Sequence, residues 1–249
     1  MQTQEGHVIG TKTGELLQFD PGVLVDDDGR IHLYSGFAPR HLAKGPLRVF
    51  TRLRRMDGGY YMELEQDMIT VKRGPLKLFP ECGEGSNNFE GHEFFEASSI
   101  RKIGLKYYFV YSSYNGHELC YAISDYPDRD FKYGGTIVSN ADIYLHGPAY
   151  EDPDNYYGCS DKRAVNYYGN NHGGMVDISG QWYIFYHRQT NGHQYSRQAC
   201  AEPIEIAPDG SIKQVEITSC GLNGGPLLGE GTYEARIACQ LYSAEDAYF

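Results

Sequence analysis

The sequence predicts an all-β protein, and three observations lead to this prediction. Aromatic residues are abundant, since the 249 residues include 22 Tyr and 11 Phe, and aromatic rings pack well on pleated strands. The 30 Gly residues supply turns between strands. Few windows show the apolar spacing of a helix, whereas alternating runs rich in Tyr, Val, Ile and Phe recur along the whole chain.

The alternating runs define the expected strands in chain order. Short turns separate them, and Asp26 to Asp28 are expected to form a solvated hairpin turn that Gly29 closes. The main runs are Arg30–Phe37, Gly59–Val71, Lys106–Ser113, Glu118–Asp125, Gln181–Arg188 and Ser211–Thr218.

Charge and hydropathy exclude two kinds of partner. The chain has 22 Lys and Arg against 33 Asp and Glu, a formal net charge of −11, and an acidic surface repels phosphate backbones. The one basic cluster, residues 48–55, is short. No apolar run approaches the ~18 residues of a membrane-spanning helix. We therefore expect neither a nucleic-acid partner nor a membrane.

The cysteine spacing and the N-terminal residues give information on the cellular compartment of the protein. The six cysteines lie far apart without a CxxC pair, so neither a zinc knuckle nor a dense disulfide framework is indicated, and buried free thiols are expected. Residues 1–6 lack the basic and apolar regions of a secretory signal. Localisation stays unknown: the chain is either cytoplasmic or a fragment of a longer secreted enzyme. The cysteines are Cys82, Cys120, Cys159, Cys200, Cys220 and Cys239.

An internal repeat organises the chain. Three similar strands start at Gly29, Gly104 and Gly180, which are 75 and 76 residues apart. A shorter strand precedes each glycine, so every unit begins with a hairpin. A regular period of this kind is typical of repeat architectures.

One ionisable residue opens each hairpin at a matching place. Asp20 lies nine residues before its glycine, whereas Glu96 and His172 each lie eight before theirs. In a radial array such as a β-propeller, the innermost strands face a common axis. The repeat therefore predicts a propeller in which these three side chains converge. For Asp20 alone, an Asx turn before Pro21 is the alternative.

Two carboxylates and a histidine among aromatic residues suggest glycoside hydrolysis. That reaction needs a protonated carboxylic acid for the leaving oxygen and a second, ionised carboxylate. Glu96 stands among Phe94, Phe95 and Ile100, an apolar setting that favours its neutral form. Glu96 is therefore the expected proton donor, and a nearby ionised Asp20 would reinforce this.

Four ordered segments resemble glycoside hydrolase family 43, the five-bladed propeller enzymes that include β-xylosidases and α-L-arabinofuranosidases. The resemblance spans Leu16 to Thr218. The segments are FDPGVLVDDDGRIHLYSG from Phe19, FFEASSIRKIGLKYYFVYSS from Phe94, NNHGGMVDISGQWYIFYHR from Asn170 and AEPIEIAPDGSIKQVEIT from Ala201.

The resemblance implies roles for particular residues. Glu96 matches the general acid of an inverting enzyme, and Asp20 matches the aspartate that orients the acid and tunes its pKa. His172 matches the axial histidine that binds a calcium ion or its water shell, so calcium is an expected cofactor. A hydrogen-bonding plug in the central channel is the other interpretation of His172.

Three further residues are expected to contact substrate. Arg197 matches a substrate-contacting arginine of the family in a loose alignment. Phe95 directly precedes Glu96, and Phe37 ends the expected strand Arg30–Phe37. Aromatic walls of this kind would suit a sugar.

The chain departs from the family at its beginning, because residues 1–15 are too short for the first blade, which carries the catalytic base. We expect a single, incomplete propeller domain over residues 1–249 with about four blades: 16–80, 94–140, 171–218, and a closing-blade remnant or linker at 220–249. Three consequences stay open. The chain is a fragment with weak or no activity, another copy lends a carboxylate, or Asp20 acts as the base. Open strand edges self-associate, so a homo-oligomer is expected.

The predicted function is hydrolysis of xylan-type plant polysaccharide with inversion, releasing xylose, arabinose or both, with xylo- or arabino-oligosaccharides as substrate. An open pocket would also admit longer xylan chains. One alternative is a carbohydrate-binding propeller that is catalytically impaired because it lacks the base. A related propeller glycosidase acting on fructans or arabinans is another.

Overall fold

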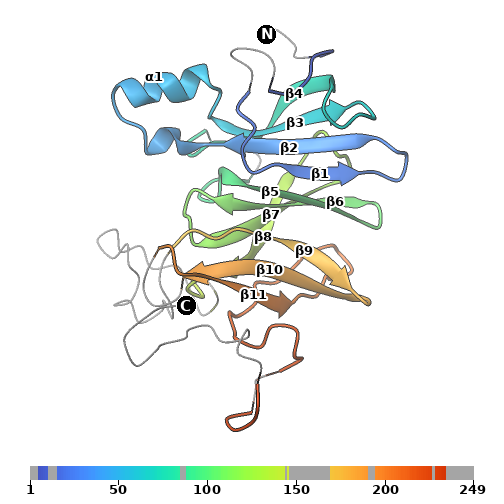
Figure 1. Ribbon diagram of the computed structural model, residues 1–249, viewed down its shortest axis with the longest axis vertical. Coiled ribbons are helices and arrows are strands. Elements are labelled where there is room, and N and C mark those ends of the chain that lie inside the picture. The colour runs from blue at the N-terminus through green and yellow to red at the C-terminus, as the bar shows by residue number, and fades with distance from the viewer. Residues whose placement is uncertain are drawn as a thin grey trace.

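The computed structural model describes residues 5–10, 16–84, 88–143, 145, 169–189, 194–225 and 228–233. Within them, three antiparallel sheets lie one over another and do not close into a ring (Figure 1). The predicted all-β, incomplete propeller is thereby confirmed. Residues 220–225 and 228–233 contain turns and bends without a strand, and the rest of the expected closing remnant lies outside the described residues.

Blade 1 is a four-stranded sheet in which each strand pairs with its neighbour along the chain. Its innermost strand pairs with the next one through a tight turn, and Gly29 adopts a φ of +80° there, which glycine tolerates without strain. A short 3₁₀ turn, η1 (Pro39–His41), and a helix, α1 (Pro46–Leu53), separate the second and third strands. The strands are β1 (Gly22–Val25), β2 (Ile31–Phe37), β3 (Gly58–Leu64) and β4 (Val71–Pro80).

Blade 2 repeats this plan with longer inner strands. The register between its first two strands shifts on both sides of Glu96, which marks a β-bulge, and Ala97 has a φ of +64° at that point. A bulge re-aims side chains and is common beside functional sites. The strands are β5 (Phe94–Ile103), β6 (Lys106–Ser113), β7 (Glu118–Ser124) and β8 (Lys132–Ser139).

Blade 3 has three described strands, in the order β11-β10-β9. The segment after the last strand returns to blade 2, where Val215 forms a parallel bridge with Val138 and donates a hydrogen bond to Ile137 at 2.9 Å. This segment therefore links blade 3 to the last strand of blade 2. The strands are β9 (Gly173–Ile178), β10 (Gln181–Gln189) and β11 (Arg197–Pro203).

Aromatic side chains fill the space between blades 1 and 2. Phe79 of β4 is fully buried and stacks on Phe109 of β6, with ring centroids 3.9 Å apart and planes 8° from parallel. Tyr34 and Tyr61 pack into the same cluster. This explains much of the aromatic abundance of the sequence, because stacked rings add about 0.5–1.5 kcal/mol per pair to the stability that burial provides.

A second, more aliphatic core joins blades 2 and 3. It includes Val110, Met175 and Ile184, and Ile212 and Ile217 of the returning segment complete it. A third cluster covers the other face of blade 1, where Leu16 and Ile9 pack against residues of β2 and β3. Each sheet therefore packs on at least one face, and the packing fixes the sheets relative to one another.

The innermost strands approach each other closely. A Cβ atom at Gly22 of β1 would lie 2.6 Å from the carbonyl oxygen of Ser98 in β5. Only glycine allows this approach, because any side chain would collide with the neighbouring backbone. The close contact brings the starts of β1 and β5 together, where two of the predicted site residues lie.

The prediction that Asp26 to Asp28 form a solvated turn is wrong for one of the three aspartates. Asp26 is 6% exposed, because Lys102 and Tyr107 of blade 2 reach across and donate hydrogen bonds to its carboxylate. Burial alone would raise the pKa of Asp26, but these hydrogen bonds outweigh it and lower the pKa to about 2. Asp27 and Asp28 remain exposed, as predicted.

We expect the Asp26→Asn variant to lose about 2 kcal/mol of unfolding free energy at neutral pH, because the lowered pKa of Asp26 means that folding stabilises its carboxylate by roughly that amount. The loss should shrink as the pH falls from 4 towards 2, where the wild-type carboxylate also becomes protonated. Chemical denaturation across this pH range measures both effects.

The matched control is Asp27→Asn. Asp27 pairs with the same Lys102 but its side chain is 86% exposed, so its removal should change stability by less than about 1 kcal/mol. Equal losses in the two variants would contradict the assigned role of Asp26.

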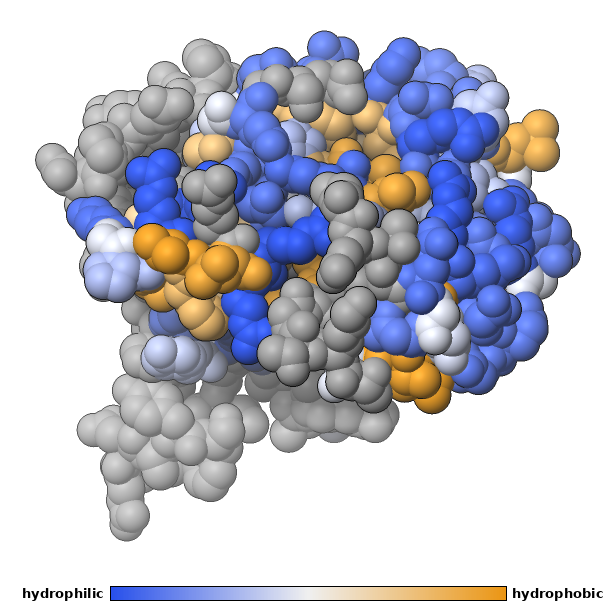
Figure 2. Space-filling view, turned by 90° about the horizontal axis from the view of Figure 1, so that it is seen from above, coloured by the Kyte–Doolittle hydropathy of each residue, from blue (hydrophilic) through white to orange (hydrophobic). Residues whose placement is uncertain are grey.

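Helix α1 was not anticipated from the sequence, and its apolar side chains remain exposed. Leu47, Phe50 and Leu53 are 56%, 49% and 71% exposed. Figure 2 shows apolar side chains gathered on the side of the molecule where α1 lies. Among the described residues, no helix is long and apolar enough to span a bilayer.

Candidate active site

The three predicted axial residues meet at one end of the sheets. Asp20 lies two residues before β1, Glu96 is in β5, and His172 immediately precedes β9. Nε2 of His172 lies 2.6 Å from Oε1 of Glu96, and Nδ1 of His172 lies 3.7 Å from Oδ2 of Asp20. The structure therefore brings together residues that 152 positions separate in the sequence.

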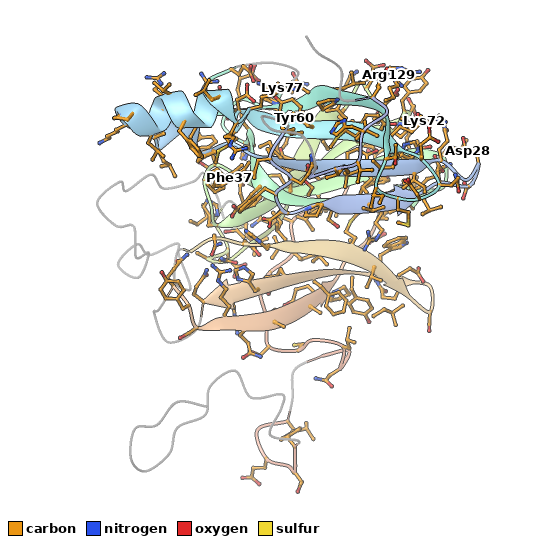
Figure 3. All side chains as sticks on the ribbon, turned by 45° about the horizontal axis from the view of Figure 1, so that its top comes forward. Asp28, Phe37, Tyr60, Lys72, Lys77 and Arg129 are labelled. Carbon is orange, nitrogen blue, oxygen red and sulfur yellow. The ribbon has the colours of Figure 1, made fainter. Side chains whose placement is uncertain are left out.

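The site lies at the end of the sheets where β2 finishes. Figure 3 labels Phe37, the last residue of β2, at this end and Asp28, in the turn before β2, at the other. Side-chain exposure is 31% for Asp20, 29% for His172 and 9% for Glu96. The cluster is therefore accessible from solvent on the side of Asp20 and His172, with Glu96 behind them.

Asp20 is held in an unusual backbone conformation. Its φ is +44°, and its carbonyl oxygen accepts a hydrogen bond of 3.3 Å from the backbone N–H of Ser98 in blade 2. Burial raises the pKa of Asp20 above its ordinary value, and the Glu96 carboxylate raises it further, while His172 and the Ala97 backbone N–H partly offset the rise. Its Oδ2 atom is buried and accepts no hydrogen bond from any described residue.

Glu96 has a polar partner in addition to apolar neighbours. The sequence places it among Phe94, Phe95 and Ile100, and the structure adds the short contact to His172. The bulge in β5 at Glu96 places this carboxyl group at the inner end of the blade. His172 therefore connects the two carboxylates of the site.

A second histidine, His187, belongs to the site and was not predicted from the sequence. It lies on β10, and its ring centroid is 5.6 Å from that of His172. Burial lowers its pKa to about 4, with smaller electrostatic contributions from the neighbouring Arg197 and His172. Both ring nitrogens are buried, and neither has a hydrogen-bond partner among the residues that the structure describes. The repeat could not reveal it, because it occupies a second strand rather than the start of an innermost one.

The predicted substrate-binding residues all lie near this cluster. Phe37 stacks on Phe19, with centroids 4.4 Å apart, and meets Phe95 edge-on at 5.2 Å. All three rings are partly exposed. Arg197 is exposed at the start of β11 and acts electrostatically on His187. Phe19 was missed, although it directly precedes Asp20 as Phe95 precedes Glu96.

The aromatic wall is fixed by backbone hydrogen bonds. The N–H of Gly36 donates to the carbonyl of Phe19 at 3.1 Å, and the N–H of Ala38 donates to that of Phe95 at 2.9 Å. The loops that carry Asp20 and Glu96 are thus both tied to the end of β2. A rigid apolar surface beside two carboxylates suits the apolar face of a sugar ring.

The donor atoms of Asp20, Glu96 and His172 also lie within 4.8 Å of one another. Two carboxylates and an imidazole can hold a divalent cation. Oδ2 of Asp20, which accepts no hydrogen bond from the described residues, is the type of oxygen that a hard cation prefers. A carboxylate pair, a histidine and an aromatic wall at the axis of a propeller are the components of a glycosidase site.

Comparison with known proteins agrees with the assignment of this site to the glycosidases. The family model described as Glycosyl hydrolases family 43 matches residues 3–212. The chain is 46% identical over 246 residues to a xylosidase/arabinosidase of Thermoclostridium stercorarium, an alignment that covers 98% of this chain and 47% of that protein. The chain therefore belongs to glycosyl hydrolase family 43, as its motifs predicted.

Other similar proteins agree with this family assignment. A β-xylosidase of Xylanibacter ruminicola is 28% identical, over 79% of this chain and 58% of that protein. The solved structure of a family 43 enzyme of Xanthomonas citri shares the fold, with a TM-score of 0.56 and 22% identity over 80% of this chain and 56% of that one. The chain spans about half the length of the curated relatives it matches.

Proposed function

We propose that this chain forms part of a glycosidase that hydrolyses xylan-type polysaccharide with inversion and releases xylose, arabinose or both. The observation that carries the proposal is the contact between Glu96 and His172 beside Asp20, at the junction of three blades. Family membership and the names of the relatives, xylosidase/arabinosidase and β-xylosidase, support the reaction and the substrate class.

In this proposal, Glu96 donates a proton to the oxygen of the leaving group. Asp20 orients the acid and tunes its proton affinity, and His172 holds the Glu96 carboxyl group in place through the 2.6 Å contact. Phe19, Phe37 and Phe95 form the apolar wall against which the sugar lies, and Arg197 binds polar groups of the substrate at the rim.

The substrate class is tested with aryl xylosides and aryl arabinofuranosides, together with xylo-oligosaccharides. Release of xylose or arabinose, with NMR spectra that show the inverted anomer first, supports the proposal. Binding of xylo-oligosaccharides in calorimetry without product formation would instead identify a carbohydrate-binding module, and turnover of only fructans or arabinans would assign another substrate.

The base is the remaining question of the mechanism. Among the described residues, Asp20 is the second carboxylate of the cluster, so it is the candidate base within this chain. In the Asp20→Ala variant, azide or formate should restore turnover if Asp20 is the base. If Asp20 tunes the acid, these anions should have no effect and the pH profile of kcat/KM should shift instead.

A calcium ion is proposed as the cofactor, held by His172 and water molecules with Oδ2 of Asp20 as an oxygen ligand. The support is that the donor atoms lie within 4.8 Å of one another and that this oxygen accepts no hydrogen bond from the described residues. Bound calcium would neutralise the local negative charge and fix the two carboxylates.

Removal of calcium is expected to lower the melting temperature. A ligand present at about 100 times its Kd stabilises a protein by roughly 2.7 kcal/mol, so chelation followed by calorimetry should detect the loss, and added Ca²⁺ should reverse it. The His172→Ala variant should not respond to calcium. A wild-type melting temperature that prolonged chelation leaves unchanged would contradict the cofactor proposal.

A homo-oligomer is proposed as the state in solution. The innermost strands keep apolar side chains exposed, with Val23 and Val25 of β1 at 42% and 59% and Ile178 of β9 at 38%. Covering them against a second copy would remove apolar surface from water. Light scattering after size exclusion should give a multiple of the 28.1 kDa chain mass, and a monomer would contradict the proposal.

A further inference from the structure

Blade 2 contains a second cluster of side chains of the kinds that bind metal ions. His92 is in the turn before β5, and Glu118 and Cys120 stand two residues apart on β7, so their side chains share one face of the strand. Nδ1 of His92 lies 2.8 Å from Oε1 of Glu118 and 4.0 Å from Sγ of Cys120. The three donor atoms all lie within 4.8 Å of one another.

These distances are close to those of a zinc site. Zinc binds nitrogen at about 2.0 Å and sulfur at about 2.3 Å in tetrahedral geometry, so its donor atoms lie roughly 3.3–3.7 Å apart. The observed separations of 2.8 Å and 4.0 Å lie on either side of this range. Side-chain shifts of about half an ångström, which protein side chains readily make, would bring them into it.

The carboxylate already has the supporting hydrogen bonds that metal ligands usually have. Ser113 and Asn115 donate to Oε1 of Glu118, and Thr136 donates to Oε2. Hydrogen bonds of this type orient ligating carboxylates and hold them ready for a cation.

The other two ligands are also held in place. The His92 ring stacks on Tyr133, with centroids 4.6 Å apart and planes 11° from parallel. Cys120 is fully buried beside the hydroxyl of Thr136, at 3.8 Å. Access is possible from one side, because the His92 side chain is 23% exposed whereas that of Glu118 is fully buried.

The chemistry of the donors favours zinc over calcium. A thiolate, an imidazole and a carboxylate form a soft to borderline ligand set, whereas the Asp20, Glu96 and His172 cluster contains no sulfur. The two clusters are made of different residues, and the new one plays no part in the proposed hydrolysis.

We propose that His92, Glu118 and Cys120 bind a zinc ion, with a water molecule in the fourth position. On binding, the Cys120 thiol loses its proton to solvent and a zinc–sulfur bond forms, so the step involves no electron transfer. The ion would link the turn before β5 to β7, and it would thereby brace the start of the strand that carries Glu96.

Cobalt(II) is the probe, because a thiolate bound to it gives a charge-transfer absorption that oxygen and nitrogen ligands do not. The full chain, kept reduced with a phosphine, should show this band on titration with CoCl₂, saturate at one equivalent and lose the band when Zn²⁺ is added. The His92→Asn variant should require at least 10-fold more cobalt for the same signal. In the wild type, Zn²⁺ should also raise the melting temperature.

The Cys120→Ala variant should lose the band, whereas the matched Cys82→Ala variant should keep it, because Cys82 is free and outside the cluster. Circular dichroism establishes that each variant is folded, and His92→Asn provides the test if Cys120→Ala is not. Absence of the band in the folded wild type, or its persistence in folded Cys120→Ala, would overturn the proposal and identify the cluster as a hydrogen-bond network only.

Discussion

The Glu96→Gln variant is expected to lose about 10²–10⁴-fold in kcat on xylosides with poor leaving groups, the usual contribution of general acid catalysis. Gln keeps the shape of Glu96 and can still accept a hydrogen bond from His172, but it has no proton to give. On substrates with activated aryl leaving groups the loss should be much smaller, because these depart without protonation. Steady-state kinetics over a series of leaving groups measures this dependence.

The control for this prediction is Glu90→Gln, since Glu90 is an exposed carboxylate near the start of the same blade. It should retain wild-type kinetics on every substrate. If Glu96→Gln lost the same factor on activated and unactivated substrates, Glu96 would not be the proton donor, whatever the size of the loss.

The Phe79→Ala variant is expected to lose about 3–5 kcal/mol of unfolding free energy, the usual cost of removing a fully buried aromatic ring. Phe79 contacts the rings of Phe89, Phe94, Phe109 and Phe131. Truncation would leave a cavity in the core between blades 1 and 2. Chemical denaturation gives the unfolding free energy, and we expect a fall in melting temperature of roughly 2–4 °C per kcal/mol.

Phe50→Ala provides the comparison, because Phe50 on α1 is 49% exposed. Its removal should change stability by about 0.5 kcal/mol or less. A loss for Phe79→Ala as small as that for Phe50→Ala would show that the aromatic core does not hold the first two blades together.

The meeting of Asp20, Glu96 and His172 could be predicted from the sequence, because it follows from symmetry. Each residue occupies the same place in a repeat of about 75 residues, and equivalent places in a radial array face one axis. No side-chain detail was needed for this step. Alternating apolar residues, which are a local signal, also predicted strands such as β2, β6 and β10. The expected strand Ser211–Thr218 was wrong, because this segment forms only isolated bridges at Ile212 and Val215.

Other features of the fold and the site could not be predicted, mostly because they depend on contacts between blades. Asp26 stands in a run of three aspartates that resembles a solvated turn, and its burial comes from Lys102 and Tyr107, which are 76 and 81 residues away. His187 stands on the second strand of its blade, where no repeat position marked it. Helix α1 has only eight residues, which is too short for a helical period to be recognised in the sequence.

The strand order within the sheets has a consequence for the order of folding. In every described sheet each strand pairs with its neighbour along the chain, so a blade can form from local hairpins, and contacts between nearby residues form fastest. Asp20, Glu96 and His172 come from three different blades. The site therefore exists only after separately formed blades have docked, which makes the contact between His172 and Glu96 one of the last events in folding.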